Sequence, residues 1–157
     1  MNVDDPEMLN VIRRSMVARI ATLSRNGRPS INPLYYVARQ RHLWLGTSDW
    51  TLAARNVKAD TRVSVLFNVE EDPTEQRVLR IVGRAEVRTD RDIIRSYNLQ
   101  VARKYILTPA GVINGVAHLW QIPLKLTYNA QGAEKGQACV IDILPEQAEF
   151  LYDHPRG

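Results

Sequence analysis

Apolar and polar residues alternate along most of this chain in short runs, a pattern typical of strands that bury one face in a sheet. The runs predicted as strands are 16–23, 30–37, 42–47, 62–69, 78–87, 118–122, 125–128, 138–144 and 148–152. Asn26-Gly27 predicts a hairpin between the first two, because both residues tolerate a positive φ. The polar stretch 39–41 predicts the next turn, and the acidic stretch 70–75 predicts a loop.

Proline and glycine mark special positions within these strands. Pro33 cannot donate a hydrogen bond to a ladder, so it predicts an edge, a bulge or an unpaired stretch. Gly83 lies in the middle of a strand and predicts a bulge or a close approach of another segment. Pro145 predicts the end of the strand over 138–144.

Three segments have helical spacing instead. The first begins with Asp5 as N-cap and Pro6 in the first turn, with Met8, Leu9 and Ile12 on one face. A second runs to about residue 59, capped by Ser48 or Asp49. It would carry Leu52, Ala53, Asn56 and Val57 on one side. The third covers 91–106 after Asp90, with Ile93, Ile94, Tyr97, Val101 and Tyr105 recurring along one face.

Many short strands with few helices favour a mainly-β fold, an antiparallel sheet that closes as a barrel. No repeat, low-complexity tract or long linker divides the chain, so a single domain over 1–157 is expected. Barrels of this kind hold ligands at a mouth or at a dimer seam.

Composition agrees with an ordinary globular domain. The chain has 157 residues, of which 45% are hydrophobic and 24% charged. No apolar run approaches the roughly 20 residues that cross a bilayer, and the acidic N-terminal stretch is unlike a secretory signal. A cytoplasmic protein that binds no membrane is therefore expected. The lone Cys139 lies in an apolar strand, where a buried, unreactive thiol is expected.

The net charge of +4 has two interpretations. Scattered arginines are typical of a solvated surface, but a guanidinium also matches phosphate geometry. A separate hypothesis about function is a basic barrel that binds single-stranded nucleic acid through aromatic residues and arginines. Because no basic run exceeds two residues, the expectation is no nucleic acid.

Motifs of the common catalytic centres are missing from the sequence. His42, His118 and His154 are far apart and have no metal-ligand spacing, so no metal is expected. The sequence has no G-x-S-x-G elbow, no P-loop and no G-x-G-x-x-G.

Hydroxyl side chains gather where the second helix is predicted to begin. Thr47, Ser48 and Thr51 lie there, and Arg55 follows one turn later. Free N–H groups and the positive end of the helix dipole favour an anion at such a place. Ordinary capping with a solvated Arg55 is the alternative interpretation.

The order of several segments resembles a known family. These are Val17–Pro29, Leu34–Val37, Leu43–Ser48, Ala54–Val57, Arg62–Val65, Val82–Val87 and Val140–Glu146. Together they resemble the FMN-binding split β-barrels of the pyridoxamine 5'-phosphate oxidase-like superfamily, most clearly over residues 8–90. The resemblance implies a split antiparallel β-barrel, Greek-key-like, that forms a homodimer with the cofactor at the subunit interface.

It also implies a flavin-dependent oxidoreductase that moves hydride between FMN and a small organic substrate. The flavin ring would lie along the second and third strands, and the phosphate near the second helix. Trp50 would cover a flat ring, or else pack in the core or the dimer seam. The expected cofactor-binding residues are Asn32, Pro33, Leu34, Tyr35, Leu45, Gly46, Thr47, Ser48, Trp50, Thr51 and Arg55. Catalytic residues are unknown; Tyr35, Tyr36 and His118 are candidates.

The chain departs from the family at the positions that hold phosphate. Relatives that bind FMN tightly carry Ser-Arg-Lys where this chain has Thr51-Leu52-Ala53. The oxidase subgroup carries basic residues where Ile31 and Tyr36 stand. These departures argue against a true pyridoxamine-phosphate oxidase.

They leave the deazaflavin F-420 and haem as alternative cofactors, and a non-catalytic cofactor-binding protein as an alternative function. Arg28, Arg55 and Lys58 are candidates to replace the missing cations. The segment 110–133 has no counterpart in the family. It would shape substrate access or lengthen two strands.

Overall fold

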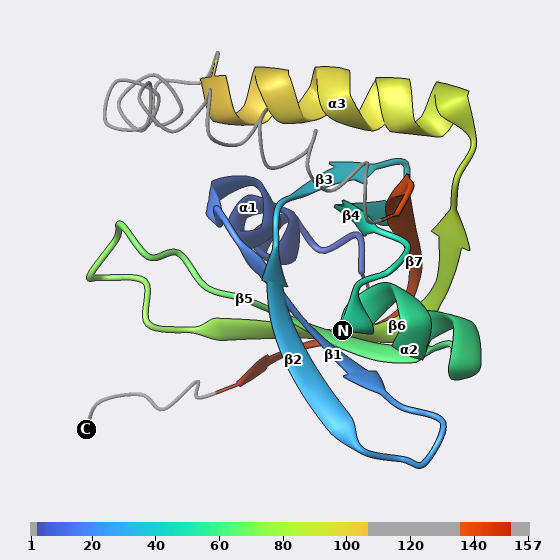
Figure 1. Cartoon of the computed structure of the whole chain (residues 1–157). Coiled ribbons are helices and arrows are strands. Elements are labelled where there is room, and N and C mark those ends of the chain that lie inside the picture. Colours follow the sequence, from blue (N-terminus) through green and yellow to red (C-terminus); the bar gives the residue numbers. More distant parts are fainter. Residues whose placement is uncertain (1–2, 107–135, 152–157) are drawn as a thin grey trace.

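The computed structural model describes residues 3–106 and 136–151 (Figure 1). The strands predicted over 118–122 and 125–128, the segment 110–133, His118 and His154 lie outside the described residues.

Seven strands form one antiparallel sheet, in the order β2-β1-β5-β6-β7-β4-β3. Their bounds are β1 Ala18–Leu23, β2 Pro29–Leu34, β3 Tyr36–Arg39, β4 His42–Ser48, β5 Arg62–Phe67, β6 Val78–Arg88 and β7 Ala138–Leu151. The expected mainly-β, Greek-key-like split barrel is therefore confirmed as a fold.

The sheet closes through one stretch of chain that serves both of its edges. β2 pairs with β1 at one edge, β3 pairs with β4 at the other, and only Tyr35 separates β2 from β3. The run predicted as one strand over 30–37 is thus two strands in different ladders. Of the three possibilities for Pro33, the structure selects the edge, where a missing N–H costs no ladder hydrogen bond.

The interior is filled by alternate residues of the strands. Ile20, Leu45, Val65, Ile81 and Ile141 are fully buried, each on the inward face of its strand. Burial of one such side chain contributes about 1.5–3 kcal/mol, so this layer is the main source of stability.

A β-bulge interrupts the pairing of β6 with β7 at Gly83, where the sequence predicted a bulge or a close approach. The register shifts between Val82 and Gly83, and Gly83 faces Pro145. A Cβ at Gly83 would overlap the backbone oxygen of Leu144. The predicted end of the strand at Pro145 is wrong: β7 continues to Leu151, because Pro145 lies at the bulge, beyond the part of β7 that pairs with β4.

The two tight turns differ in how well their residues suit them. In the first, Gly27 N donates to Ser24 O (2.9 Å), and only the glycine takes a positive φ, 77°. In the second, Gln40 and Arg41 connect β3 to β4 with φ of 47° and 68°. Two positive φ values are the geometry of a type I′ turn, which asparagine and glycine adopt more easily.

Helix α1, Pro6–Arg14, begins as predicted, with the Asp5 carboxylate accepting from Glu7 N (3.0 Å). It buries Met8, Val11 and Ile12, whereas Leu9, predicted on the same face, is 46% exposed. Helix α2 covers Leu52–Ala59. It lies against β1, β2 and β6.

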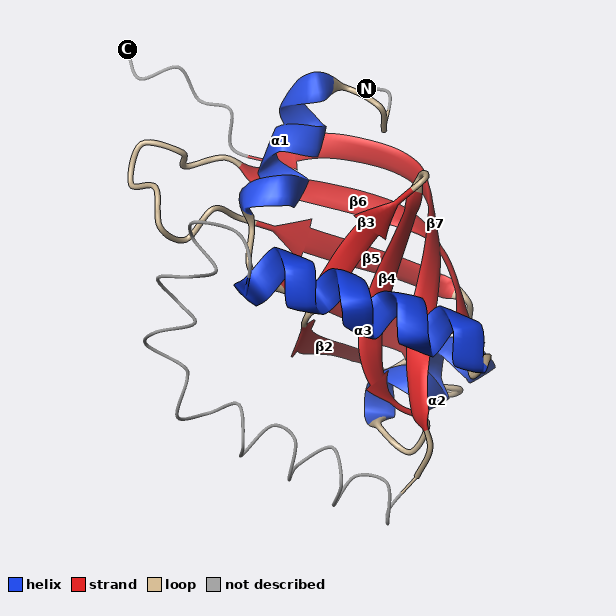
Figure 2. Ribbon diagram, turned by 90° about the horizontal axis from the view of Figure 1, so that it is seen from above, coloured by secondary structure: helices blue, strands red, loops and turns tan. Residues whose placement is uncertain are grey.

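Helix α3, Arg91–Ile106, lies across β3, β4 and β7 (Figure 2). Its predicted inward residues are half-buried, and none of its described side chains is fully buried. No described helix is long and apolar enough to span a bilayer.

Candidate functional site

The closure of the sheet brings the two predicted cofactor-binding stretches, 32–35 and 45–48, together. Gly46 N donates to the carbonyl oxygen of Tyr35 (3.2 Å). β2 and β4 also contact each other there, although they stand far apart in the order of the sheet. Residues 32–35 and 45–48 therefore lie side by side at the split of the barrel.

Hydroxyl groups surround the start of α2. Thr51, rather than the predicted Ser48 or Asp49, is the N-cap, and its Oγ1 accepts from Ala54 N (3.4 Å). The same hydroxyl donates to Ser48 O (2.9 Å) and lies 3.0 Å from Thr47 Oγ1. Capping thus accounts for Thr51. One cap cannot satisfy all the N–H groups of a first turn, so an anion could still bind here.

Asn32 lies on the inner face of β2, opposite the core residue Ile20. Its side-chain oxygen is buried and has no hydrogen-bond partner among the described residues. Next to it, Asn56 of α2 donates to Thr22 Oγ1 (3.0 Å) and Ser30 Oγ (3.1 Å). A buried acceptor without a donor is costly, so the Asn32 oxygen fits a ligand that brings a hydroxyl or a ring N–H.

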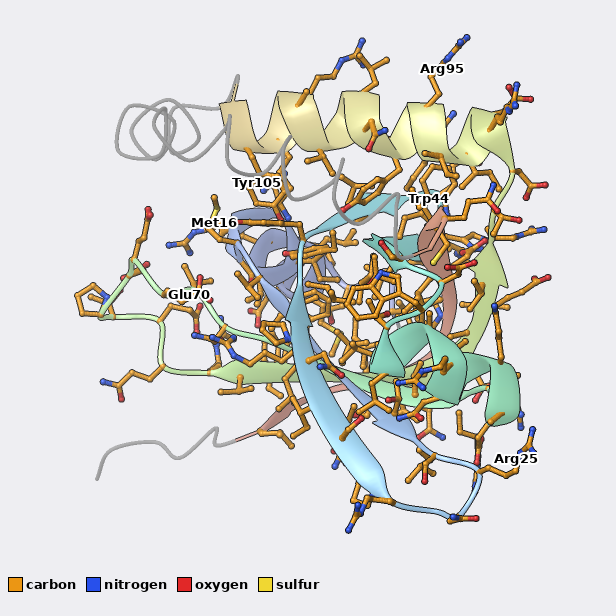
Figure 3. The ribbon with its side chains drawn as sticks, viewed as in Figure 1. Met16, Arg25, Trp44, Glu70, Arg95 and Tyr105 are labelled. Atoms are coloured by element: carbon orange, nitrogen blue, oxygen red, sulfur yellow. The ribbon has the colours of Figure 1, made fainter. Side chains whose placement is uncertain are left out.

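Four cations near α2 have no acidic partner within the part of the chain that the structure describes: Arg25, Arg28, Arg55 and Lys58. Figure 3 places Arg25 at the tip of the β1–β2 hairpin. The hydrogen bonds of Asn56 fasten α2 to this hairpin. Several other arginines are paired with carboxylates, as in Arg62–Asp60 (2.7 Å). Of the four, Arg55 lies one turn into α2, where a guanidinium fits a phosphate group, whereas Lys58 lies in the last turn of the helix.

Several predicted residues reach this surface only in part. The Leu45 side chain is fully buried, and Leu34 packs against the core. Gly46 lies beneath Tyr97 of α3, because a Cβ at Gly46 would overlap the Tyr97 ring. The predicted residues of β4 whose side chains can contact a ligand are therefore Thr47 and Ser48, which are half-buried.

Pro33 lies on the outer face of β2 with Ile31. Trp50 is 42% exposed, and its ring lies against Gly136, which precedes β7.

The two candidate tyrosines differ in environment. Tyr35 is 41% exposed beside the site. Tyr36 is fully buried, and its hydroxyl donates to the carbonyl oxygens of Ile12 and Ser15. Burial raises the pKa of Tyr36 well above its ordinary value, so its hydroxyl stays protonated and committed to these partners.

Tyr97 and Tyr105 are site neighbours that the sequence reasoning missed. The Tyr97 hydroxyl donates to Tyr35 O (3.2 Å), and the rings of Tyr105 and Tyr35 meet edge to face at 4.9 Å. Their helical spacing identified both as inward residues of a helix. The pairing of that helix with the strand junction is a long-range contact that no local pattern contains.

Other reactive groups lie away from this surface or are inert. Burial raises the pKa of Cys139 to about 11, as expected for an unreactive thiol. His42 Nδ1 lies 2.7 Å from Asp142 Oδ1 at the opposite end of β4. No group of three or more His, Cys, Asp or Glu residues that could hold a metal is found among the described residues.

Comparison with known proteins gives a family and a fold. The family model described as pyridoxamine 5'-phosphate oxidase matches residues 4–152. A search of curated sequences found no match.

Three solved structures illustrate the fold. A conserved hypothetical protein of Mycobacterium tuberculosis has 16% identity and a TM-score of 0.69, with 100% of this chain and 94% of that chain covered. An F-420 reductase has 19% identity and a TM-score of 0.60, with 89% and 94% covered. The haem storage protein HutZ of Vibrio cholerae has 19% identity and a TM-score of 0.61, with 96% and 94% covered. At these identities the likeness concerns the fold.

Proposed function

Because the chain belongs to the pyridoxamine 5'-phosphate oxidase family, we propose that it is a flavin-dependent oxidoreductase with FMN as cofactor. It would act on a small organic substrate. Bound flavin supplies the hydride chemistry, and the protein supplies binding and orientation. The observation that carries the proposal is the contact of residues 32–35 with 45–48 through Gly46 and Tyr35, next to the start of α2.

The residues present fit an FMN-type cofactor. The unpartnered oxygen of Asn32 would accept a hydrogen bond from a ring N–H or a ribityl hydroxyl. Ser48, Thr51 and Arg55 would hold the phosphate, supported by the unpaired Arg28 and Lys58. Tyr35, exposed beside them, is the candidate to exchange a proton with a substrate.

A homodimer is part of the proposal. Large hydrophobic side chains are exposed around the site: Ile31 (65%), Tyr35 (41%), Trp50 (42%) and Leu52 (45%). Apolar side chains gathered around one site are typical of an interface. Ile31→Glu should therefore shift the mass measured by light scattering from dimer to monomer. Leu144→Glu is a matched control on β7, since Leu144 is 51% exposed. A wild-type monomer would exclude the shared site.

The departures from the family argue against pyridoxamine phosphate as substrate and favour a second candidate cofactor class. Position 52 is exposed, whereas Ala53 is 2% exposed and belongs to the core. A lysine at 53 would therefore start from a buried position in this chain. A site with fewer cations for a phosphate leaves F-420 and haem as candidates, the groups named for two proteins of the same fold. A cytoplasmic location is part of the same proposal.

The visible spectrum of freshly purified protein, followed by titration with each cofactor, tests the proposal. Bands at about 370 and 450 nm are expected for a bound flavin. A Soret band would identify haem instead, and binding of F-420 alone would identify the deazaflavin. A colourless protein that binds none of the three would refute the proposal. Salt-sensitive binding of an oligonucleotide by such a protein would point to nucleic acid instead.

A further inference from the structure

The chain crosses from one edge of the sheet to the other at Tyr35, where regular pairing is interrupted. The Tyr35 carbonyl oxygen accepts from Gly46 N (3.2 Å) and from the Tyr97 hydroxyl (3.2 Å). The next backbone N–H, of Tyr36, donates to the Tyr105 hydroxyl (3.3 Å). Two side chains of α3 therefore bond to consecutive residues at the one point where β2 becomes β3.

Tyr105 joins three segments of the chain. Besides accepting from Tyr36 N, its hydroxyl lies 2.7 Å from Met16 O and 3.3 Å from Tyr36 O. Figure 3 shows Tyr105 pointing from α3 toward Met16. The hydroxyl thus holds the junction against the segment that leads into β1, the strand paired with β2.

Tyr97 fixes the junction against β4. Its ring lies directly on Gly46, at a distance that only a residue without a side chain allows. Burial raises the pKa of both Tyr97 and Tyr105, so both hydroxyls remain protonated at physiological pH. Gly46, Tyr35 and Tyr97 thereby form one hydrogen-bonded unit between β4, the junction and α3.

These bonds are directed at the junction rather than at the core. No described side chain of α3 is fully buried, and Leu99 on the same helix is 54% exposed. Tyr97 and Tyr105 lie two turns apart on this helix, and their hydroxyls form hydrogen bonds with the adjacent backbone groups Tyr35 C=O and Tyr36 N–H. The helix therefore acts on the position of the strand that carries Asn32 to Tyr35.

We infer that Tyr97 and Tyr105 are positioning residues for the cofactor site: their hydroxyls set where Asn32–Tyr35 lie relative to Gly46–Ser48. The inference rests on the proposed function, since it concerns the same site. It adds α3 to that site, although neither tyrosine needs to touch the cofactor.

The test compares Tyr97→Phe and Tyr105→Phe with Leu99→Ala, a matched change on an exposed part of α3. FMN affinity is measured by flavin fluorescence, and the environment of bound flavin by visible circular dichroism. Loss of one neutral hydrogen bond is worth about 1 kcal/mol, or roughly fivefold in affinity. Each phenylalanine variant should bind FMN about three- to tenfold more weakly and give an altered dichroism spectrum, whereas Leu99→Ala should match wild type.

The dichroism spectrum separates positioning from stability, because a purely structural role would lower Tm and leave the spectrum of bound flavin unchanged. That result would overturn the inference, as would wild-type affinity in both variants. If wild type binds F-420 or haem instead, the same comparison is made with that cofactor. A wild-type protein that binds none of the three would refute both the proposed function and this inference.

Discussion

Restoration of a family cation at position 52 tests how this chain holds a phosphate. Leu52 is the first residue of α2 and is 45% exposed, so an arginine can replace it without disturbing the core. Because Leu52 is also among the residues proposed for the dimer interface, light scattering must show that the variant keeps the mass of wild type. Without an anion, Leu52→Arg puts a positive charge at the positive end of the helix. The free energy of unfolding should fall by about 0.3–1 kcal/mol.

The gain in cofactor affinity should be larger. A hydrogen bond to a charged group contributes about 1.5–3 kcal/mol, or about 10- to 150-fold in Kd. Half-exposure of position 52 leaves solvent to screen the pair, so the lower limit applies. Leu52→Arg should therefore tighten FMN binding about tenfold.

Fluorescence titration with FMN and with riboflavin is the assay. Riboflavin lacks the phosphate, so its Kd should not change in Leu52→Arg. Leu144→Arg adds the same charge on β7, at a residue that is 51% exposed, and controls for general attraction of an anion. Equal gains for FMN and riboflavin, or an equal gain in Leu144→Arg, would refute the placement of the phosphate at α2.

The companion variant Ala53→Lys should behave in the opposite way. Ala53 is 2% exposed within the core, where an unpaired ammonium costs about 3–5 kcal/mol. The variant should unfold at a much lower urea concentration and gain no affinity for FMN. A stable Ala53→Lys with tighter FMN binding would show that the start of α2 differs from the structure described above.

Three further predictions concern other parts of the molecule. Arg55→Ala should weaken FMN binding by up to about tenfold with Tm unchanged, since Arg55 is exposed; an unchanged Kd by the same titration would remove it from the site. Gly83→Ala should cost about 1–3 kcal/mol, because the new Cβ overlaps the Leu144 carbonyl; a Tm equal to wild type would contradict the bulge. Burial lowers the pKa of Lys104 to about 7, below its unfolded value of 10.5. The unfolded state therefore binds more protons between these values, and stability should rise from pH 7 toward pH 9.5. Lys104→Met should reduce that rise in urea midpoints, and an identical rise would show that Lys104 is solvated.

The sequence correctly predicted the features that depend mainly on neighbouring residues, namely a helix start, a hairpin and a bulge. Pro6 after a capping Asp5 located α1, and Asn26-Gly27 located a hairpin. Gly83 located a bulge because a strand interior rarely accepts a residue that packs nothing.

Long-range partners decided the positions that local reasoning missed. Pro145 has a strand on one side only, so it does not end β7. Gln40 and Arg41 adopt a turn that their own preferences oppose, because the paired strands on either side impose it.

For the candidate site, sequence reasoning found both strand segments and the hydroxyls of α2. It placed the cap too early, because Ser48, Asp49 and Thr51 are equally suitable by type. Only the tertiary structure shows that the Leu45 side chain faces the core and that α3 reaches the strand junction.

The place of β7 in the sheet has a consequence for synthesis of the chain. β7 pairs with both β6 and β4, and residues such as Thr47 and Cys139 meet across more than half of the sequence. Until β7 leaves the ribosome, β1, β2, β5 and β6 form one half-sheet and the β3–β4 hairpin another, joined at Tyr35. Each half then exposes an unpaired edge, which is the usual route to aggregation. Nascent chains stalled before residue 138 should therefore need a chaperone, whereas the completed chain closes these edges itself.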